Sequence, residues 1–140
     1  MADTFAKSSI STEAAGRLIA AGEAKAAELG KAFVIAVVDD GGVLKAFSRM
    51  DGAPVLSVQV AQDKAYTAVG FGMPTHGWHD FIKDDPPLAD GAPSGIDRLV
   101  VFGGGYPLFA GDQLIGGIGV SGSHYSEDMQ VAEAALAALG

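Results

Sequence analysis

The element order of this chain can be read outward from one stretch, Phe33-Val34-Ile35-Ala36-Val37-Val38-Asp39-Asp40-Gly41-Gly42-Val43-Leu44-Lys45-Ala46-Phe47. Phe33–Val38 is a continuous apolar run rich in Val and Ile, which is typical of a strand buried on both faces. The Asp-Asp-Gly-Gly segment then favours a tight turn, because Asp accepts local backbone hydrogen bonds and Gly supplies positive φ. Val43–Phe47 returns as a second strand, so the stretch predicts a β-hairpin.

Helices are predicted on both sides of this hairpin. Before it, Ser11 or Thr12 can cap a helix whose apolar residues recur at spacings of three and four as far as Gly30. After it, Pro54 suits the first turn of a second helix, which the apolar pattern extends to about Phe71.

The segment that follows the second helix is predicted to be partly irregular. Thr75 can cap a short third helix, His76–Lys83. Asp84–Gly95 then combines prolines with small turn residues, so it is expected to be a loop.

Three further strands are predicted toward the C-terminus, at Leu99–Phe102, Tyr106–Phe109 and Leu114–Ser121. The last strand contains several glycines, which indicates that a helix or a ligand packs closely against it. Ser126 can cap a final helix. These hairpins imply a five-stranded antiparallel sheet covered by helices, in a single domain over residues 1–140 with residues 1–10 as a mobile lead-in.

Composition excludes several classes of function. The chain has 140 residues, a net charge of −8 and no Lys/Arg-rich run, so neither nucleic acid nor an anionic membrane surface is an expected partner. The absence of cysteine excludes disulfides and thiolate metal sites. No apolar stretch approaches the ~20 residues that span a bilayer. No secretory signal is recognisable, so a cytoplasmic location is expected.

Five ordered motifs resemble the GlcG/HbpS-like family. They are Val37–Gly42, Phe47–Ala53, Ala61–Ala68, Phe102–Leu108 and Ile115–Gly122, and the resemblance covers about residues 10–140. It implies a profilin-like α/β/α sandwich with a five-stranded antiparallel sheet. It also implies homo-oligomers built from dimers, up to octamers.

The same resemblance implies a haem- or tetrapyrrole-binding accessory protein, with haem as the cofactor. Many family members sit in small-molecule catabolic operons, so an enzyme remains an alternative. Such an enzyme would be a cofactor-free or metal-assisted isomerase, lyase or hydrolase that uses histidine acid/base chemistry on an aromatic or carboxylated intermediate. The sequence leaves open whether the protein is an enzyme.

All three histidines lie in segments where the chain departs from the family's usual pattern. His76 and His79 share a helical face at a spacing of three and could bind a metal, and with His124 they could supply three nitrogens. Alternatively, these three could act as catalytic acids and bases. They could equally be exposed or capping residues.

Other polar and aromatic side chains are candidate ligand contacts. Trp78 and Phe81 flank the histidine pair and could stack on a flat ligand or simply seal the short helix onto the core. Arg49 could hold a carboxylate, or it could brace its loop by pairing with a nearby Asp, such as Asp39, Asp51 or Asp63.

The glycine-rich segment before Tyr106 offers further ligand contacts. Gly104 and Gly105 could present backbone N–H groups to a carboxylate, and Tyr106 could donate a hydrogen bond to a ligand. A phosphate loop is excluded, because no helix with Lys-Ser/Thr follows these glycines. Lys64 lies mid-helix and could point into a pocket as a cation, but a solvated face is the expected arrangement.

Overall fold

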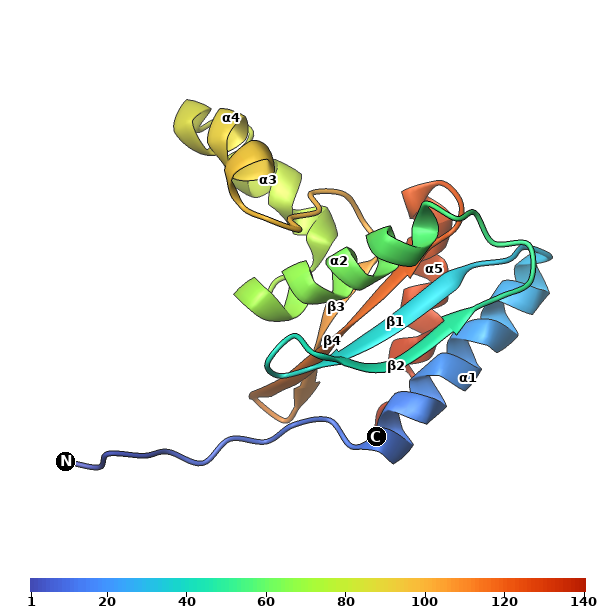
Figure 1. Ribbon diagram of the computed structural model, residues 1–140, viewed down its shortest axis with the longest axis horizontal. Helices are drawn as coiled ribbons and strands as arrows, with labels where there is room; N and C mark the ends of the chain where they lie inside the picture. Colours follow the sequence, from blue (N-terminus) through green and yellow to red (C-terminus); the bar gives the residue numbers. More distant parts are fainter.

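A computed structural model describes residues 1–140 and shows one four-stranded antiparallel sheet with the order β2-β1-β4-β3 (Figure 1). The strands are β1 (Val34–Asp39), β2 (Leu44–Arg49), β3 (Gly105–Ala110) and β4 (Gln113–Ser121). The longer helices are α1 (Thr12–Leu29), α2 (Ser57–Phe71), α4 (Pro86–Gly95) and α5 (Tyr125–Leu136). The 3-10 turn η1 (Thr75–Gly77) and the short helix α3 (Trp78–Ile82) connect α2 to α4.

The predicted hairpin is confirmed as β1 and β2. These strands pair in antiparallel register from Val34 opposite Arg49 to Val38 opposite Leu44, with a bulge between Val37 and Val38. β1 also pairs with β4 along its whole length, so it lies in the middle of the sheet. Its central place explains why Val34–Val38 is an unbroken apolar run, since both faces of the strand are covered.

Helices cover both faces of the sheet. In Figure 1, α1 and α5 lie on one side and α2 on the other. Ile35 and Val37 belong to the large core under α1 and α5, whereas Val34, Ala36 and Val38 pack toward α2. The two-residue alternation of a strand therefore assigns each residue of β1 to one of two cores.

The glycines of β4 allow α2 to approach the sheet closely, which confirms the prediction of a tightly packed element there. A Cβ at Gly119 would collide with the carbonyl oxygen of Ala61, and one at Gly117 would come 2.5 Å from that of Ala65. These positions exclude larger side chains because backbone atoms of α2 occupy the space.

The expectation of five strands is wrong, because Leu99–Phe102 does not join the sheet. The Thr67 hydroxyl, on α2, accepts a hydrogen bond from Val100 N at 3.1 Å and donates one to Arg98 O at 2.9 Å. Arg98 also has φ of 64°, which turns the chain out of the extended conformation. A side chain therefore satisfies backbone groups that a neighbouring strand would otherwise pair.

The expectation of a loop over Asp84–Gly95 is also wrong, since Pro86–Gly95 is helical. Asp85 caps this helix by accepting a hydrogen bond from Leu88 N at 3.5 Å, and Pro occupies its first turn, where no backbone donor is needed. Figure 1 shows α3 and α4 extending away from the sheet. None of the helices is long and apolar enough to cross a membrane.

Candidate functional site

The three histidines line two adjoining hollows that share Phe102 and Tyr125. The first hollow has a volume of about 420 Å³ and is lined by His76, His79, Val101, Phe102, Gly103 and Tyr125. The second has a volume of about 400 Å³ and is lined by Pro54, Leu56, Ser57, Val60, Phe102, Ser121, Gly122, Ser123, His124, Tyr125 and Asp128. We call the two hollows together the histidine groove.

The first wall of the groove is η1 and the start of α3, which carry His76 and His79. Thr75 anchors this wall to the sheet, because its buried hydroxyl accepts a hydrogen bond from Gly105 N at 2.9 Å. The His76 ring lies 5.5 Å from that of Tyr106. Both imidazoles are exposed at the edge of the hollow and are available to a ligand.

His124 forms part of the other wall and caps α5. Its Nδ1 accepts a hydrogen bond from Ser126 N at 3.2 Å and lies 2.9 Å from Ser126 Oγ. The prediction that Ser126 caps this helix is therefore wrong by two residues, since an imidazole nitrogen takes the role of the hydroxyl. The capping contact engages Nδ1 and leaves Nε2 for a ligand.

No group of three His, Asp or Glu side chains is arranged to hold a metal ion. His76 and His79 thus have no third protein ligand in place, and His124 stands in the neighbouring hollow rather than beside them. The groove offers single imidazoles to a ligand rather than a closed metal cage.

An ion pair lies directly beneath the groove. Lys64 Nζ is 2.9 Å from Asp128 Oδ2 and donates to Val120 O at 2.8 Å, and both side chains are almost fully buried. The same Nζ lies 5.2 Å from the centre of the Phe102 ring, which the two hollows share. Asp128 also lines the second hollow.

Burial shifts the pKa of both partners toward the neutral form. Desolvation lowers the pKa of Lys64 and raises that of Asp128, while the attraction between the two charges opposes each shift. The expectation of a solvated Lys64 is therefore wrong. The signal was present in the sequence, because Lys64 lies on the same helical stripe as Val60, Thr67 and Ala68.

The glycine segment supports the groove from below. Gly104 and Gly105 are buried, and a Cβ at Gly104 would come 2.6 Å from Lys64 Nζ. Gly104 also has φ of 126°, a conformation that favours glycine. Neither residue lines a hollow, so close packing accounts for both glycines.

Tyr106, Trp78, Phe81 and Arg49 lie outside the lining of the groove. The Tyr106 hydroxyl donates to Glu133 Oε1 at 2.9 Å, and burial raises its pKa. Arg49 is exposed at the end of β2 and forms no ion pair. Asp63, one of the partners suggested for Arg49, pairs with Arg98 instead, whose Nε lies 2.8 Å from Asp63 Oδ1.

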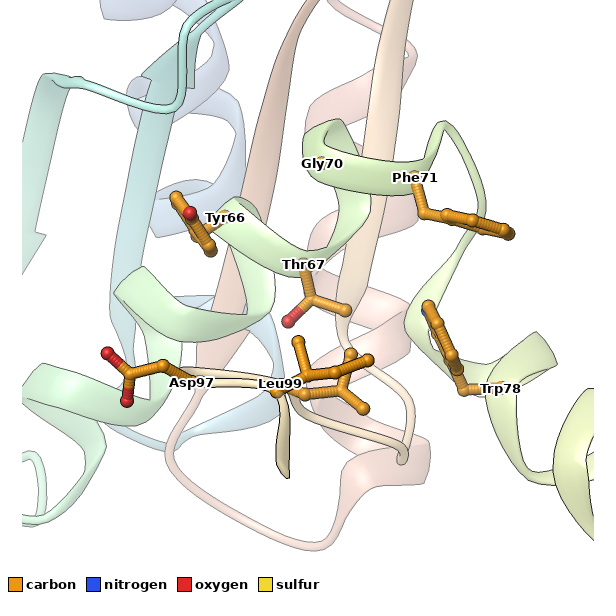
Figure 2. A pocket seen from close by; sticks show the side chains of 8 residues that line it. Tyr66, Thr67, Gly70, Phe71, Trp78, Asp97 and Leu99 are labelled. Atoms are coloured by element: carbon orange, nitrogen blue, oxygen red, sulfur yellow. The ribbon is translucent and has the colours of Figure 1, made fainter. Parts of the chain in front are cut away.

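Trp78 lines a separate hollow of about 240 Å³, which shares no lining residue with the groove. Figure 2 shows Tyr66, Thr67 and Phe71 of α2 around this space, together with Trp78 and Leu99. The ring of Phe71 lies 5.2 Å from that of Trp78 and 5.8 Å from that of Phe81. Trp78 and Phe81 therefore belong to one aromatic cluster with Phe71, and neither lines the groove.

Comparisons with known proteins identify related sequences and a related fold. A family model described as "Haem degrading protein HbpS-like" matches residues 10–137. A 15.0 kDa protein from the dhaT-dhaS intergenic region of Citrobacter freundii is 38% identical over 127 residues, covering 91% of this chain and 89% of that protein. Protein GlcG of Escherichia coli strain K12 is 37% identical over 112 residues, covering 80% of this chain and 81% of that protein. The crystal structure of a PduOC:Heme complex superposes with a TM-score of 0.88 at 32% identity, covering 94% of this chain and 96% of that one.

Proposed function

The chain belongs to the haem-degrading HbpS-like family, and we propose that it is a haem-binding accessory protein whose ligand occupies the histidine groove. The observation that carries the proposal is the placement of three imidazoles around two hollows with a shared aromatic wall. Phe102 and Tyr125 are each 46% exposed, so both rings are open to a flat ligand.

The chemistry of the lining suits haem in two respects. Histidine is a common axial ligand of haem iron, and His76, His79 and His124 each stand at the edge of a hollow. Each hollow falls within the roughly 300–1,000 Å³ typical of small-molecule sites. Haem, when bound, would supply its iron for ligation, while the chain would supply imidazole nitrogens and apolar rings.

No Lys or Arg lines the groove, so the haem carboxylates find no cation there. Binding would rest on stacking and on imidazole ligation, with the carboxylate edge left in water. We therefore expect the affinity for haem to change little between low and moderate salt concentration, because salt weakens ion pairs and leaves stacking almost unaffected.

A hemin titration of the purified protein, followed in the Soret region, tests the proposal. The wild-type protein should shift the Soret band, and replacing the histidines one at a time by alanine should identify the ligand. Phe102→Ala should weaken binding, whereas Phe109→Ala is a matched control, since Phe109 is 42% exposed but lies on β3 away from the groove. A spectrum that remains that of free hemin at every protein concentration would refute haem binding.

An enzyme of small-molecule catabolism is the second candidate, and one observation favours it. His124 and the carboxyl group of Asp128 line the same hollow, and burial raises the pKa of Asp128. An imidazole and a carboxyl group in one cavity can act as an acid/base pair. If this function holds, the protein should convert an aromatic or carboxylated compound, and the His124→Ala variant should lose that activity.

A cytoplasmic homo-oligomer built from dimers is part of the same proposal. Apolar side chains on the outside of the molecule support it, since Phe71, Phe81 and Ile96 are each about half exposed. Light scattering coupled to size-exclusion chromatography would measure the assembled mass against the 14.2 kDa of one chain. A monomer at micromolar concentration would refute the assembly.

A further inference from the structure

The ion pair beneath the histidine groove takes no direct part in the haem contacts described above. We propose that Lys64 and Asp128 are positioning residues, which hold the segment of Phe102 and the segment of His124 together and thereby fix the places of these two rings. The inference rests on the proposed function only where haem affinity is the readout, since the positions of the two rings can be measured without haem.

Lys64 connects three separate parts of the chain. From α2 its ammonium group donates to Val120 O on β4 and to Asp128 on α5. It also lies against the ring of Phe102 and within 2.6 Å of the place where Gly104 would carry a Cβ. The path of residues 102–104 is therefore fitted around the lysine side chain, and Phe102 is the aromatic residue that both hollows share.

Asp128 fixes the wall that carries His124. While Oδ2 receives the lysine, Oδ1 accepts a hydrogen bond from Ser123 N at 3.1 Å. Ser123 directly precedes His124, the residue that caps α5. One carboxylate thus ties the chain just before His124 to the lysine that supports Phe102, so these two segments are coupled.

The energetics of buried ion pairs show how positioning can be separated from stability. Replacing both partners of a buried ion pair by apolar side chains of similar size often leaves stability unchanged or improves it. Replacing only one partner leaves the other charge buried without a counter-charge, which is destabilising. Apolar side chains can fill the same space, but they cannot accept the hydrogen bond from Ser123 N or donate one to Val120 O. Stability and groove geometry should therefore respond differently to the double replacement.

The decisive variant is Lys64→Met/Asp128→Leu, compared with each single replacement. The matched control is Lys25→Met/Glu28→Leu, which removes a surface pair on α1 with a separation of 3.7 Å, in which Lys25 is partly and Glu28 fully exposed. Three quantities are measured: thermal unfolding, the NMR signals of the Phe102 and His124 rings without haem, and the affinity for hemin.

We expect the single replacements to unfold at lower temperature and the double replacement to recover most of that loss. The ring signals of Phe102 and His124 should nevertheless differ from wild type, and hemin should bind about tenfold more weakly, roughly the equivalent of one lost hydrogen bond. The control should match wild type in all three measurements. A stable double variant with wild-type ring signals and wild-type affinity would overturn the inference.

Asp128→Asn provides a second test if the double variant does not fold. The amide oxygen can still accept the hydrogen bond from Ser123 N, while the charge that holds Lys64 is lost. The Phe102 signals should then move and the His124 signals should stay close to wild type. Unchanged signals from Phe102 would overturn the inference. Failure of wild-type protein to bind hemin would refute the haem function alone.

Discussion

Replacing Lys64 by Met should destabilise the protein strongly at neutral pH. The change removes the ammonium group but keeps most of the apolar stem, so the loss isolates the charge and its hydrogen bonds. Asp128 would remain 2% exposed, with the loop amides as its remaining partners. Breaking a buried pair in this way typically costs about 3–5 kcal/mol.

The expected loss can be converted into a melting temperature. For a domain of this length, 1 kcal/mol corresponds to about 3 °C, so Lys64→Met should unfold roughly 10–15 °C below wild type at pH 7. Lys25→Met, which breaks the surface pair on α1, should change the free energy of unfolding by less than about 0.5 kcal/mol. Circular dichroism and urea titration at matched pH would measure both variants.

The pH dependence of the stability of Lys64→Met distinguishes an unpaired buried carboxylate from a simple packing defect. Burial raises the pKa of Asp128 even in the presence of Lys64, and removal of the lysine would raise it further. Between these two pKa values, the folded variant keeps a proton on Asp128 that the unfolded chain has released. The free energy of unfolding of the variant therefore falls as pH rises from about 4, the pKa of an exposed Asp, to the raised pKa of Asp128. The deficit relative to wild type should therefore be smaller at pH 5 than at pH 7. A deficit below about 1 kcal/mol at pH 7, or one independent of pH, would refute the reasoning.

Three further replacements test the scaffold around the groove. Thr67→Val should cost about 1–3 kcal/mol in a urea titration, because it leaves Val100 N without an acceptor; a neutral result would show that Thr67 does not hold residues 98–100. Gly119→Ala should cost about 3 kcal/mol or more by the same assay, because the added Cβ meets the Ala61 carbonyl; wild-type stability would contradict the close approach of α2. Trp78→Phe should cost less than about 2 kcal/mol, because Trp78 Nε1 has no hydrogen-bond partner to lose; a larger loss would reveal a partner.

The parts of the fold that could be predicted are those determined by local sequence. The β1–β2 hairpin follows from an apolar run and a turn of Asp and Gly, and α1 from its cap at Ser11 and its end at Gly30. Leu99–Phe102 has equally strong strand character, yet its Val100 N donates to the distant hydroxyl of Thr67, which in turn donates to Arg98 O just before the segment. That contact joins residues far apart in the chain and has no local signature.

The candidate site shows the same division. The spacing of His76 and His79 predicts their shared face, and both do line one hollow. For the neighbouring aromatics the sequence left two readings open, contact with a ligand or packing onto the core, and Trp78 is buried and lines a different hollow. Adjacent residues of a helix point in different directions, so Trp78 does not share the face of His79. Lys64 was missed because a lone lysine is normally solvated, and only its distant partner Asp128 makes burial tolerable.

The distribution of charge around the groove favours one class of ligand over another. Lys64, the nearest described cation, is already paired with Asp128, no Lys or Arg lines either hollow, and the whole chain carries a net charge of −8. A small carboxylate held mainly by its charge would gain nothing there. Haem carries its carboxylates on one edge, so its apolar faces can meet Phe102 and Tyr125 while that edge stays in water. Small aromatic carboxylates should therefore fail to compete with hemin, and metal-free protoporphyrin should bind more weakly because it cannot engage a histidine nitrogen.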